Sequence, residues 1–251
     1  MTDLAGRVVL LTGAAGGIGQ ATARTLASAN ARVLLHDVNI GRVKALADEI
    51  GDQAHALAAD LSDAAATQSL WDEAIAVHGR VDVLVNNAGT YPPAPLEDSL
   101  EDWVKVWDFS LAVNLLAPAI LCRAAVTSFS QQPGGGIIVN LASRAAFRGE
   151  DPEYWHYAAA KAGVVAMTRT FARQYGRNGV TAFAVAPGYV DTALNQVFRD
   201  TVGIQVAADQ TSLGEVAQPQ DVANVLAFLA SGLARHATGT TIDINGASYV
   251  R

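Results

Sequence analysis

The hydrophobic pattern of this chain alternates between two kinds of segment along most of its length. Short runs rich in Val, Ile and Leu are separated by longer segments in which apolar residues recur with a helical spacing. Short apolar runs that alternate with helices are typical of parallel strands buried in repeated βαβ units. Seven strands are predicted, over residues 7–12, 31–37, 53–60, 81–87, 136–142, 180–187 and 240–246.

Helices are predicted between these strands, and no change of composition marks a second domain. Either Ser62 or Asp63 could cap the helix that follows it, because both side chains accept hydrogen bonds from free backbone N–H groups. Seven strands are enough for a doubly wound sheet, so one α/β domain is predicted over residues 1–251. The predicted helices cover residues 17–29, 41–50, 63–78, 99–130, 153–176 and 218–231.

Three irregular stretches break this alternation, and each follows the carboxyl end of a predicted strand. They cover residues 90–98, 143–156 and about 188–218. Ligands of open α/β sheets bind at this edge, so we expect these stretches to form the walls of a pocket. Three aromatic residues in them, Tyr91, Trp155 and Tyr189, either line that pocket or pack on the edge of the sheet.

A glycine-rich turn, LTGAAGGIGQA, connects the first predicted strand to the first predicted helix. Glycine lets the backbone approach a pyrophosphate closely, and the N-terminus of a helix offers free N–H groups and a partial positive charge. Gly13, Gly17 and Gly19 are therefore candidate phosphate-binding residues. A glycine cluster alone also fits a tight strand-to-helix turn, so this assignment depends on the other motifs.

Asp37 ends the second predicted strand, at the distance expected for an acidic residue that accepts hydrogen bonds from an adenosine ribose. Its carboxylate would repel a ribose 2′-phosphate. No Arg or Lys stands just before Gly17 or just after Asp37 to bind such a phosphate. The sequence therefore favours NAD over NADP, unless Asp37 merely ends its strand and caps a turn.

The segment YWHYAAAK places a tyrosine and a lysine four residues apart. On a helix, Tyr157 and Lys161 would lie one above the other on one face. Tyr157 could deliver a proton to a carbonyl oxygen that gains charge, and the ammonium of Lys161 would lower the pKa of the phenol. His156 would point about a hundred degrees away, so it is interpreted as a structural or rim residue.

These motifs together resemble the short-chain dehydrogenase/reductase family. The resemblance rests on TGAAGGIG at residues 12–19, NNAG at 86–89, the Tyr157/Lys161 pair and PGYVDT at 187–192. TGTTIDINGA also resembles the last strand of the family. The family implies a Rossmann-type, doubly wound parallel sheet of seven strands with helices on both faces, and a substrate lid at about residues 188–215.

The resemblance also implies an active site. The family's serine, tyrosine, lysine and asparagine match Ser143, Tyr157, Lys161 and Asn114. Ser143 would hold the substrate oxygen as charge develops. Lys161 would also bind the nicotinamide ribose, and Asn114 would support a water chain to solvent.

The same resemblance assigns cofactor contacts. Asp60 and Leu61 would border the adenine, Asn86 and Gly89 would line the ribose floor braced by Thr12, and the segment from Pro187 would hold the carboxamide. The implied cofactor-binding residues are Thr12, Gly13, Gly17, Ile18, Gly19, Asp37, Asp60, Leu61, Asn87, Ala88, Gly89, Tyr157, Lys161, Pro187, Gly188, Val190 and Thr192.

Two intervals depart from the family pattern. Ser143 and Tyr157 are fourteen residues apart, one more than is commonest, which predicts a bulged loop between them. About three extra residues lie between Trp103 and Asn114, so Ser110 would occupy the asparagine's place if the helix kept its usual register. Asn114 is favoured because the sequence that follows it fits the family well.

Composition and charge narrow the possible partners. Hydrophobic residues make up 51% and charged residues 16%, which indicates a compact domain and hints at surface buried in an oligomer. The net charge of −7 offers no cationic surface for nucleic acid or anionic lipid, and no run is expected to span a bilayer. Cys122 is the only cysteine, which excludes an intrachain disulfide and a multi-cysteine metal site. No metal is predicted, and the absence of a signal-peptide pattern predicts a cytoplasmic location.

The sequence thus predicts an oxidoreductase that interconverts a secondary alcohol and a ketone with NAD(H), with Tyr157 as general acid and base. One alternative is an NADPH-dependent 3-oxoacyl-carrier-protein-type ketoreductase, for which Arg144 and Arg148 leave room. Another is a non-catalytic regulator that senses the dinucleotide. The family resemblance implies a homotetramer formed through residues 99–130, residues 153–176 and the last strand. The substrate, its stereochemistry and the physiological direction are not determined.

Overall fold

The computed structural model describes residues 3–251 apart from the side chains of residues 195, 197 and 198. It has a parallel seven-stranded sheet with the order β3-β2-β1-β4-β5-β6-β7, which confirms the predicted Rossmann-type fold. The strand order reverses between β1 and β4, which are neighbours. The strands are β1 (Val8–Thr12), β2 (Arg32–His36), β3 (Ala54–Leu57), β4 (Val83–Asn86), β5 (Gly136–Leu141), β6 (Val180–Pro187) and β7 (Thr241–Ile244).

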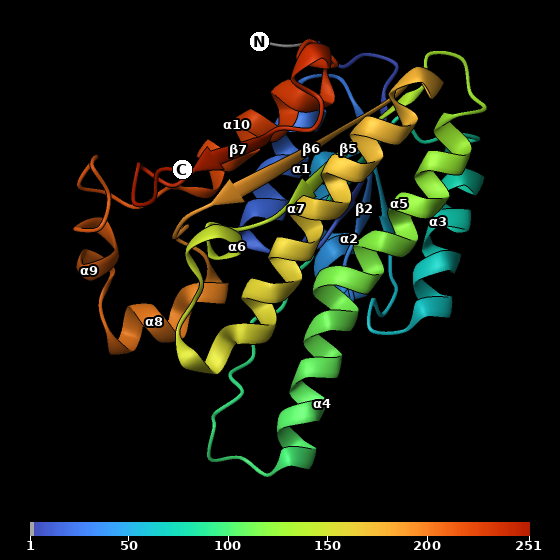
Figure 1. Ribbon diagram of the computed structural model, residues 1–251. Helices are drawn as coiled ribbons and strands as arrows, with labels where there is room; N and C mark the ends of the chain where they lie inside the picture. The colour runs from blue at the N-terminus through green and yellow to red at the C-terminus, as the bar shows by residue number, and fades with distance from the viewer. Residues whose placement is uncertain (1–2) are drawn as a thin grey trace.

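Helices connect the strands and cover both faces of the sheet (Figure 1). The three shortest of them, α6, α8 and α9, fall in the irregular stretches and were not predicted, because segments of four to six residues carry no helical period. The α-helices are α1 (Gly17–Ser28), α2 (Ile40–Ile50), α3 (Ala64–His78), α4 (Leu100–Leu111), α5 (Ala117–Phe129), α6 (Ala145–Arg148), α7 (Trp155–Tyr175), α8 (Gln196–Thr201), α9 (Ile204–Ala208) and α10 (Pro219–Ala230).

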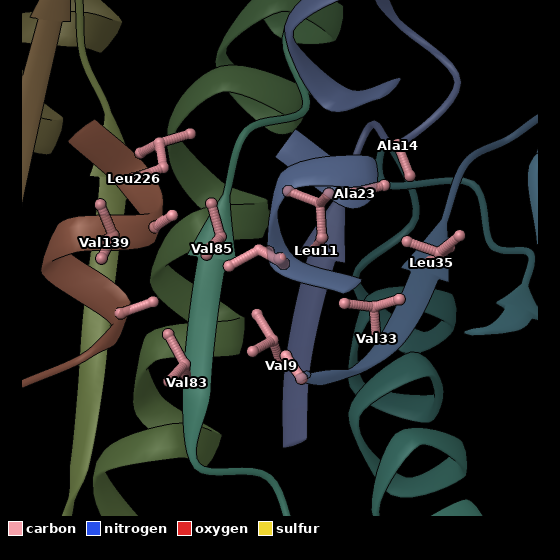
Figure 2. Close-up of a cluster of buried hydrophobic side chains, with 14 of the residues drawn as sticks. Val9, Leu11, Ala14, Ala23, Val33, Leu35, Val83, Val85, Val139 and Leu226 are labelled. Carbon is pink, nitrogen blue, oxygen red and sulfur yellow. The ribbon is translucent and has the colours of Figure 1, made fainter. Parts of the chain in front are cut away.

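The sheet separates two hydrophobic cores. Successive side chains of a strand point to opposite faces, so β1 contributes to both cores. Val9 and Leu11 pack with Ala23 of α1 and Leu226 of α10 (Figure 2). The other face of β1 packs against α3 and α5, through residues that include Val8, Leu10, Trp71 and Leu121. This burial on both faces explains why the central strands β1, β4 and β5 are mainly apolar without alternation.

Residues 100–129 form one continuous helix that contains a π-helical segment, η1, at Ala112–Leu116. A π-helical turn accommodates an extra residue within a helix, which explains part of the long interval before Asn114. The helix also corrects one expectation, because by length and composition it could cross a bilayer, with a mean hydropathy of 1.8 in its most apolar window. Half of that window is buried inside the protein, as expected for a core helix.

Candidate active site

The candidate site lies at the carboxyl ends of β1, β4, β5 and β6, where the strand order reverses. Four segments meet there: the glycine-rich turn after β1, the segment after β4, the segment from Ser143 after β5, and the loop from Gly188 after β6. The first turns of α7 add Tyr157 and Lys161. This edge is where open α/β sheets bind ligands, so the fold brings the predicted motifs to one place.

The glycine-rich turn is packed so closely that side chains do not fit. A Cβ placed on Gly13, whose φ is +65°, would lie 2.7 Å from Cα of Ala88, and one on Gly19 would lie 2.1 Å from the carbonyl oxygen of Gly13. Gly16, the N-cap of α1, has no side chain to cap the helix, and the first turn carries no acidic residue. The N-terminus of α1 thus offers free N–H groups to an anion, and the turn fits a dinucleotide pyrophosphate. Ile18 packs against the core below this turn.

Thr12 and Asn87 join the glycine-rich turn to the segment after β4. The Thr12 hydroxyl accepts hydrogen bonds from the backbone N–H groups of Asn87 and Ala88, both at 3.0 Å. The Asn87 amide donates to the carbonyl oxygens of Thr12 at 2.9 Å and of Gly13 at 3.0 Å. These bonds fix the two backbone segments side by side.

The side chain of Asn86 does not line a ribose floor, which corrects the expectation from the sequence. Its amide is buried and donates to the Oδ1 atom of Asn140 at 2.8 Å and to the Cys122 thiol at 3.4 Å. Asn140 donates in turn to the Thr168 hydroxyl at 2.9 Å. The Asn86 amide therefore ties β4 to β5 and α5, and Asn140 extends the connection to α7.

Asp37 contacts the glycine-rich turn directly. Its Oδ2 atom accepts a hydrogen bond from the backbone N–H of Ala15 at 3.1 Å, and its Oδ1 atom accepts one from Asn39 at 3.1 Å. On the same side of the turn, the guanidinium of Arg42 donates to the carbonyl oxygen of Ala15 at 2.8 Å. Arg42 is a cation that the sequence analysis missed, because it lies five residues after Asp37, on α2.

Asp60 and Leu61 lie beyond β3, which ends at Leu57 rather than at the predicted residue 60. The Asp60 carboxylate is exposed and accepts two hydrogen bonds from Ser62, whose hydroxyl and N–H lower the pKa of that carboxyl. Leu61 is buried in the core that includes Trp71. The leucine therefore anchors this segment, and only the aspartate is accessible.

Tyr157 faces Ser143 and Lys161 within the protein. The Ser143 hydroxyl is close enough to hydrogen-bond with the phenol and lower its pKa. The Lys161 ammonium lies 5.6 Å from the centroid of the Tyr157 ring and donates to the Leu141 carbonyl oxygen at 2.9 Å. The serine, the tyrosine and the lysine thus form one cluster at the end of β5.

The pKa values in this cluster differ from the sequence-based expectation. Burial raises the pKa of Tyr157 to about 12, although the Ser143 hydroxyl opposes this effect. Burial also lowers the pKa of Lys161 to about 8. The expected lowering of the phenol pKa by Lys161 is therefore wrong for the chain alone, because desolvation is the largest effect on the phenol and the opposing effect comes from Ser143. The phenol is protonated at neutral pH and can donate a proton.

Asn114 lies in the π-helical segment η1 and clamps the backbone of Thr90. Its amide nitrogen donates to the Thr90 carbonyl oxygen at 2.9 Å, and its Oδ1 atom accepts from the Thr90 N–H at 3.1 Å. A Cβ placed on Gly89 would lie 3.1 Å from that Oδ1 atom and 3.7 Å from the Lys161 nitrogen. Asn114, rather than Ser110, thus borders the segment from Gly89.

Aromatic rings surround Tyr157. Tyr91 meets the Tyr157 ring edge to face at 4.8 Å, and it stacks in parallel on Tyr154 at 3.9 Å. Trp155, one residue further on, is 47% exposed and packs against Trp103 of α4 instead. Of the two, Tyr91 is the aromatic residue that borders the candidate catalytic tyrosine.

The loop after β6 runs from the sheet to the glycine-rich turn. Pro187 is the last residue of β6, and a Cβ on Gly188 would lie 2.9 Å from Cβ of Asn245. Val190 forms an isolated parallel bridge with Ala217. Further along the loop, Thr192 lies close to the glycine-rich turn. A Cβ placed on Gly17 would be 2.7 Å from the methyl group of Thr192.

Comparison with known proteins gives one coherent group of relatives. A family model described as enoyl-(acyl carrier protein) reductase matches residues 13–247. The D-threitol dehydrogenase of Mycolicibacterium smegmatis is 36% identical over 99% of this chain and 95% of its own length. The cis-4-hydroxycyclohexanecarboxylate dehydrogenase of Sinomonas cyclohexanicum is 39% identical over 96% of this chain and 95% of its own length.

Solved structures give the same picture. A candidate NAD(P)-dependent gluconate 5-dehydrogenase from Beutenbergia cavernae, with NADP bound at low occupancy, superposes with a TM-score of 0.90 at 37% identity, covering 98% of this chain and 97% of that chain. A 3-ketoacyl-(acyl-carrier-protein) reductase from Brucella melitensis, complexed with NADH, superposes with a TM-score of 0.90 at 31% identity, covering 99% and 100%.

Proposed function

The chain belongs to the short-chain dehydrogenase/reductase family, and we propose that it interconverts a secondary alcohol and a ketone with NAD(H), using Tyr157 as general acid and base. Its relatives are dehydrogenases and reductases, so the chain is an NAD(P)-dependent oxidoreductase that acts on hydroxyl groups. The observation that carries the finer proposal is the cluster of Ser143, Tyr157 and Lys161 beside the glycine-rich turn.

The proposed reaction moves one hydride and one proton. A nicotinamide held beside this cluster would supply or accept the hydride at the carbinol carbon. In oxidation, the substrate hydroxyl gives its proton to the Tyr157 phenolate, and in reduction the neutral phenol returns it to the carbonyl oxygen. Ser143 donates a hydrogen bond to the same oxygen and stabilises its developing negative charge. The Lys161 ammonium lies near the Tyr157 ring and supplies positive charge there.

The proposed cofactor is NAD(H) rather than NADP(H). Asp37 holds a carboxylate against the glycine-rich turn through Ala15, where an adenosine ribose would carry the 2′-phosphate of NADP. The Asp37 carboxylate would repel the negative charges of a 2′-phosphate, so the geometry favours NAD. Arg42 donates to the Ala15 carbonyl oxygen, and this bond places a cation beside the same turn. The relatives do not decide the matter, because they bind NADP or NADH.

A second reading is an acyl-carrier-protein ketoreductase. The Brucella melitensis reductase favours it, and Arg144 and Arg148 are the N-cap and the last residue of the short helix that follows Ser143. Reduction of an acetoacetyl thioester with a kcat/KM well above those of simple ketones would support this reading. A non-catalytic regulator, by contrast, would bind NADH without turning over any alcohol or ketone.

We also propose that residues 188–215 form a lid over the substrate. In Figure 1, α8 and α9 lie outside the layered body, beyond the end of β6. Arg199 of α8 pairs with Asp191 at 3.1 Å, which links α8 to the loop that contacts the glycine-rich turn. Protection of this segment from proteolysis by NADH and substrate would support the lid. The side chains of residues 195, 197 and 198 lie outside the described part of it.

A homotetramer is proposed from the family and from exposed apolar surface. Phe109 and Leu116 on the long helix are 46% and 51% exposed. A surface groove between α5 and α7 is lined by residues that include Phe171 and Tyr175, and β7 is an edge strand of the sheet. Light scattering at micromolar protein tests this assembly, and a monomer would contradict it. The cytoplasmic location remains a prediction.

One experiment tests the proposed function as a whole. Absorbance of the reduced nicotinamide is followed while the protein is given NAD or NADP with a panel of polyols, sugars, hydroxy acids, steroids and acyl thioesters. The proposal predicts turnover of at least one secondary alcohol with NAD, at a kcat/KM above that measured with NADP. Higher efficiency with NADP for every substrate would contradict the cofactor choice.

A further inference from the structure

Arg144 is a half-buried arginine whose guanidinium hydrogen-bonds to neutral side chains. Its guanidinium donates to the Ser248 hydroxyl at 2.7 Å and to the Gln210 side-chain oxygen at 3.2 Å, and both are neutral groups. Among the described residues it makes no ion pair. By contrast, five other arginines pair with carboxylates: Arg24, Arg80, Arg148, Arg199 and Arg251.

The environment of Arg144 is poor in compensating charge. Burial lowers the pKa of Arg144, and Arg148 on the same short helix adds to this effect, while Glu150 and Tyr91 oppose it. The carboxylate of Glu150 is already paired with Arg148, at 3.6 Å. A guanidinium carries five N–H donors, and two of them have the partners described above. Donors therefore remain for a bidentate acceptor.

Arg144 also stands at the right place to touch a substrate. It directly follows Ser143, and its backbone N–H donates to the Pro187 carbonyl oxygen at 2.9 Å. Its electrostatic neighbour Tyr91 packs edge to face on Tyr157. The partners of its guanidinium come from the proposed lid, through Gln210, and from the C-terminal segment, through Ser248. The cation thus lies where these two segments meet the wall of the site.

We propose that Arg144 binds a carboxylate group of the substrate, so that the preferred substrates are hydroxy acids and the corresponding oxo acids. This inference rests on the proposed function and narrows its substrate class. A carboxylate beside Arg144 supplies the charge that the protein itself does not place there, and its planar pair of oxygens matches the guanidinium. The carbinol of the same molecule then reaches Ser143 and Tyr157.

The test compares each acid with its own amide. 3-Hydroxybutyrate, 4-hydroxycyclohexanecarboxylate and gluconate are oxidised by the wild type, Arg144→Met, Arg144→Lys and Arg148→Met, alongside the three primary amides. We expect at least one acid to exceed its amide about tenfold in kcat/KM. Arg144→Met should abolish that preference through KM, and Arg144→Lys should keep part of it. The matched control Arg148→Met should leave it unchanged.

A binding arm keeps the inference testable without turnover. Calorimetry measures how butyrate, butyramide, cyclohexanecarboxylate and cyclohexanecarboxamide bind to the protein saturated with NADH, with and without Arg144→Met. Tighter binding of the carboxylates that disappears in the variant supports the inference. Equal binding of acid and amide overturns it, even if neutral alcohols are oxidised and the proposed function stands. An effect of Arg144→Met on acetoacetyl-CoA reduction but on none of the carboxylates would also overturn it, in favour of a phosphate-bearing thioester.

Discussion

Nδ1 of His156 lies 2.7 Å from the hydroxyl oxygen of Ser110, and both side chains are fully buried. The same oxygen accepts a hydrogen bond from the Asn114 amide at 3.1 Å. Burial lowers the pKa of His156, so its ring is neutral at pH 7 and can accept the Ser110 proton. A buried chain of hydrogen bonds therefore runs from α7 to the amide that clamps Thr90.

This chain predicts unequal losses of stability. Asn114→Ala leaves the N–H and the carbonyl of Thr90 without their partner, whereas Ser110→Ala removes one hydroxyl from the chain. We expect Asn114→Ala to lower the free energy of unfolding by about 3 kcal/mol and Ser110→Ala by about 1 kcal/mol. Urea denaturation at constant m-value measures both losses. Equal losses would contradict the prediction, because they would show that the two hydrogen bonds to Thr90 add no stability beyond that of the Ser110 hydroxyl.

The fold could be predicted from the sequence because the central strands β1, β4 and β5 are mainly apolar runs of ordinary length. The glycine-rich turn could also be recognised from its sequence. The structure explains why glycines are needed there, because neither Ala88 nor Thr192 leaves room for a side chain. The boundaries were less clear. β3 ends three residues early, because Ala58, Ala59 and Asp60 look like strand residues but pair with nothing in the sheet.

The residues that the sequence did not reveal act through tertiary contacts. Arg42 reaches the glycine-rich turn from α2, and Arg144 meets partners that are 66 and 104 residues away in the chain. The interval between Ser143 and Tyr157 is filled by the short helix α6 and a 3₁₀ turn, Pro152–Tyr154, instead of a bulged loop. The direction of the Tyr157 pKa shift also depends on how deeply the phenol is buried, and a sequence motif does not give this burial.

The pH dependence of the two reaction directions should differ. Oxidation needs the phenolate of Tyr157, whose pKa is raised to about 12 in the chain alone, so its fraction grows about tenfold per pH unit below the pKa. Reduction needs the neutral phenol, which is present throughout that range. Between pH 6 and 8, kcat/KM for the alcohol should rise with pH, while kcat/KM for the ketone stays nearly flat. Opposite trends would exclude Tyr157 as the titrating group.

Lys161 should lower stability in a pH-dependent way. Its folded pKa is lowered to about 8 from 10.5, so between these values the unfolded chain holds a proton that the folded chain has lost. The contribution of Lys161 to the free energy of unfolding therefore rises as the pH rises from 8 to 10.5. Below pH 8 the full cost of burying the ammonium lowers the stability of the protein. Lys161→Met should be more stable than the wild type at pH 7 by roughly 1–3 kcal/mol. Thermal unfolding at pH 7 and pH 10 checks that this advantage shrinks.

Asp37 should control the choice between NAD and NADP through its charge. Asp37→Asn keeps an acceptor for the Ala15 N–H but removes the charge that would repel a 2′-phosphate. The ratio of kcat/KM for NADP to that for NAD should rise about tenfold, which corresponds to about 1.4 kcal/mol. Adding Arg42→Ala should reverse most of this gain, because Arg42 then no longer attracts the phosphate. A ratio unchanged by Asp37→Asn would leave NAD preference without a cause at this residue.

Removal of the Tyr157 hydroxyl tests the central claim most directly. Single-turnover rates of NADH formation are compared for the wild type, Tyr157→Phe and the matched control Tyr154→Phe, with NADH binding followed by fluorescence. The account predicts a loss of about 10²–10⁴-fold for Tyr157→Phe with nearly unchanged NADH affinity, and little loss for Tyr154→Phe. A Tyr157→Phe variant that keeps near-normal turnover would contradict the assignment of this phenol as acid and base.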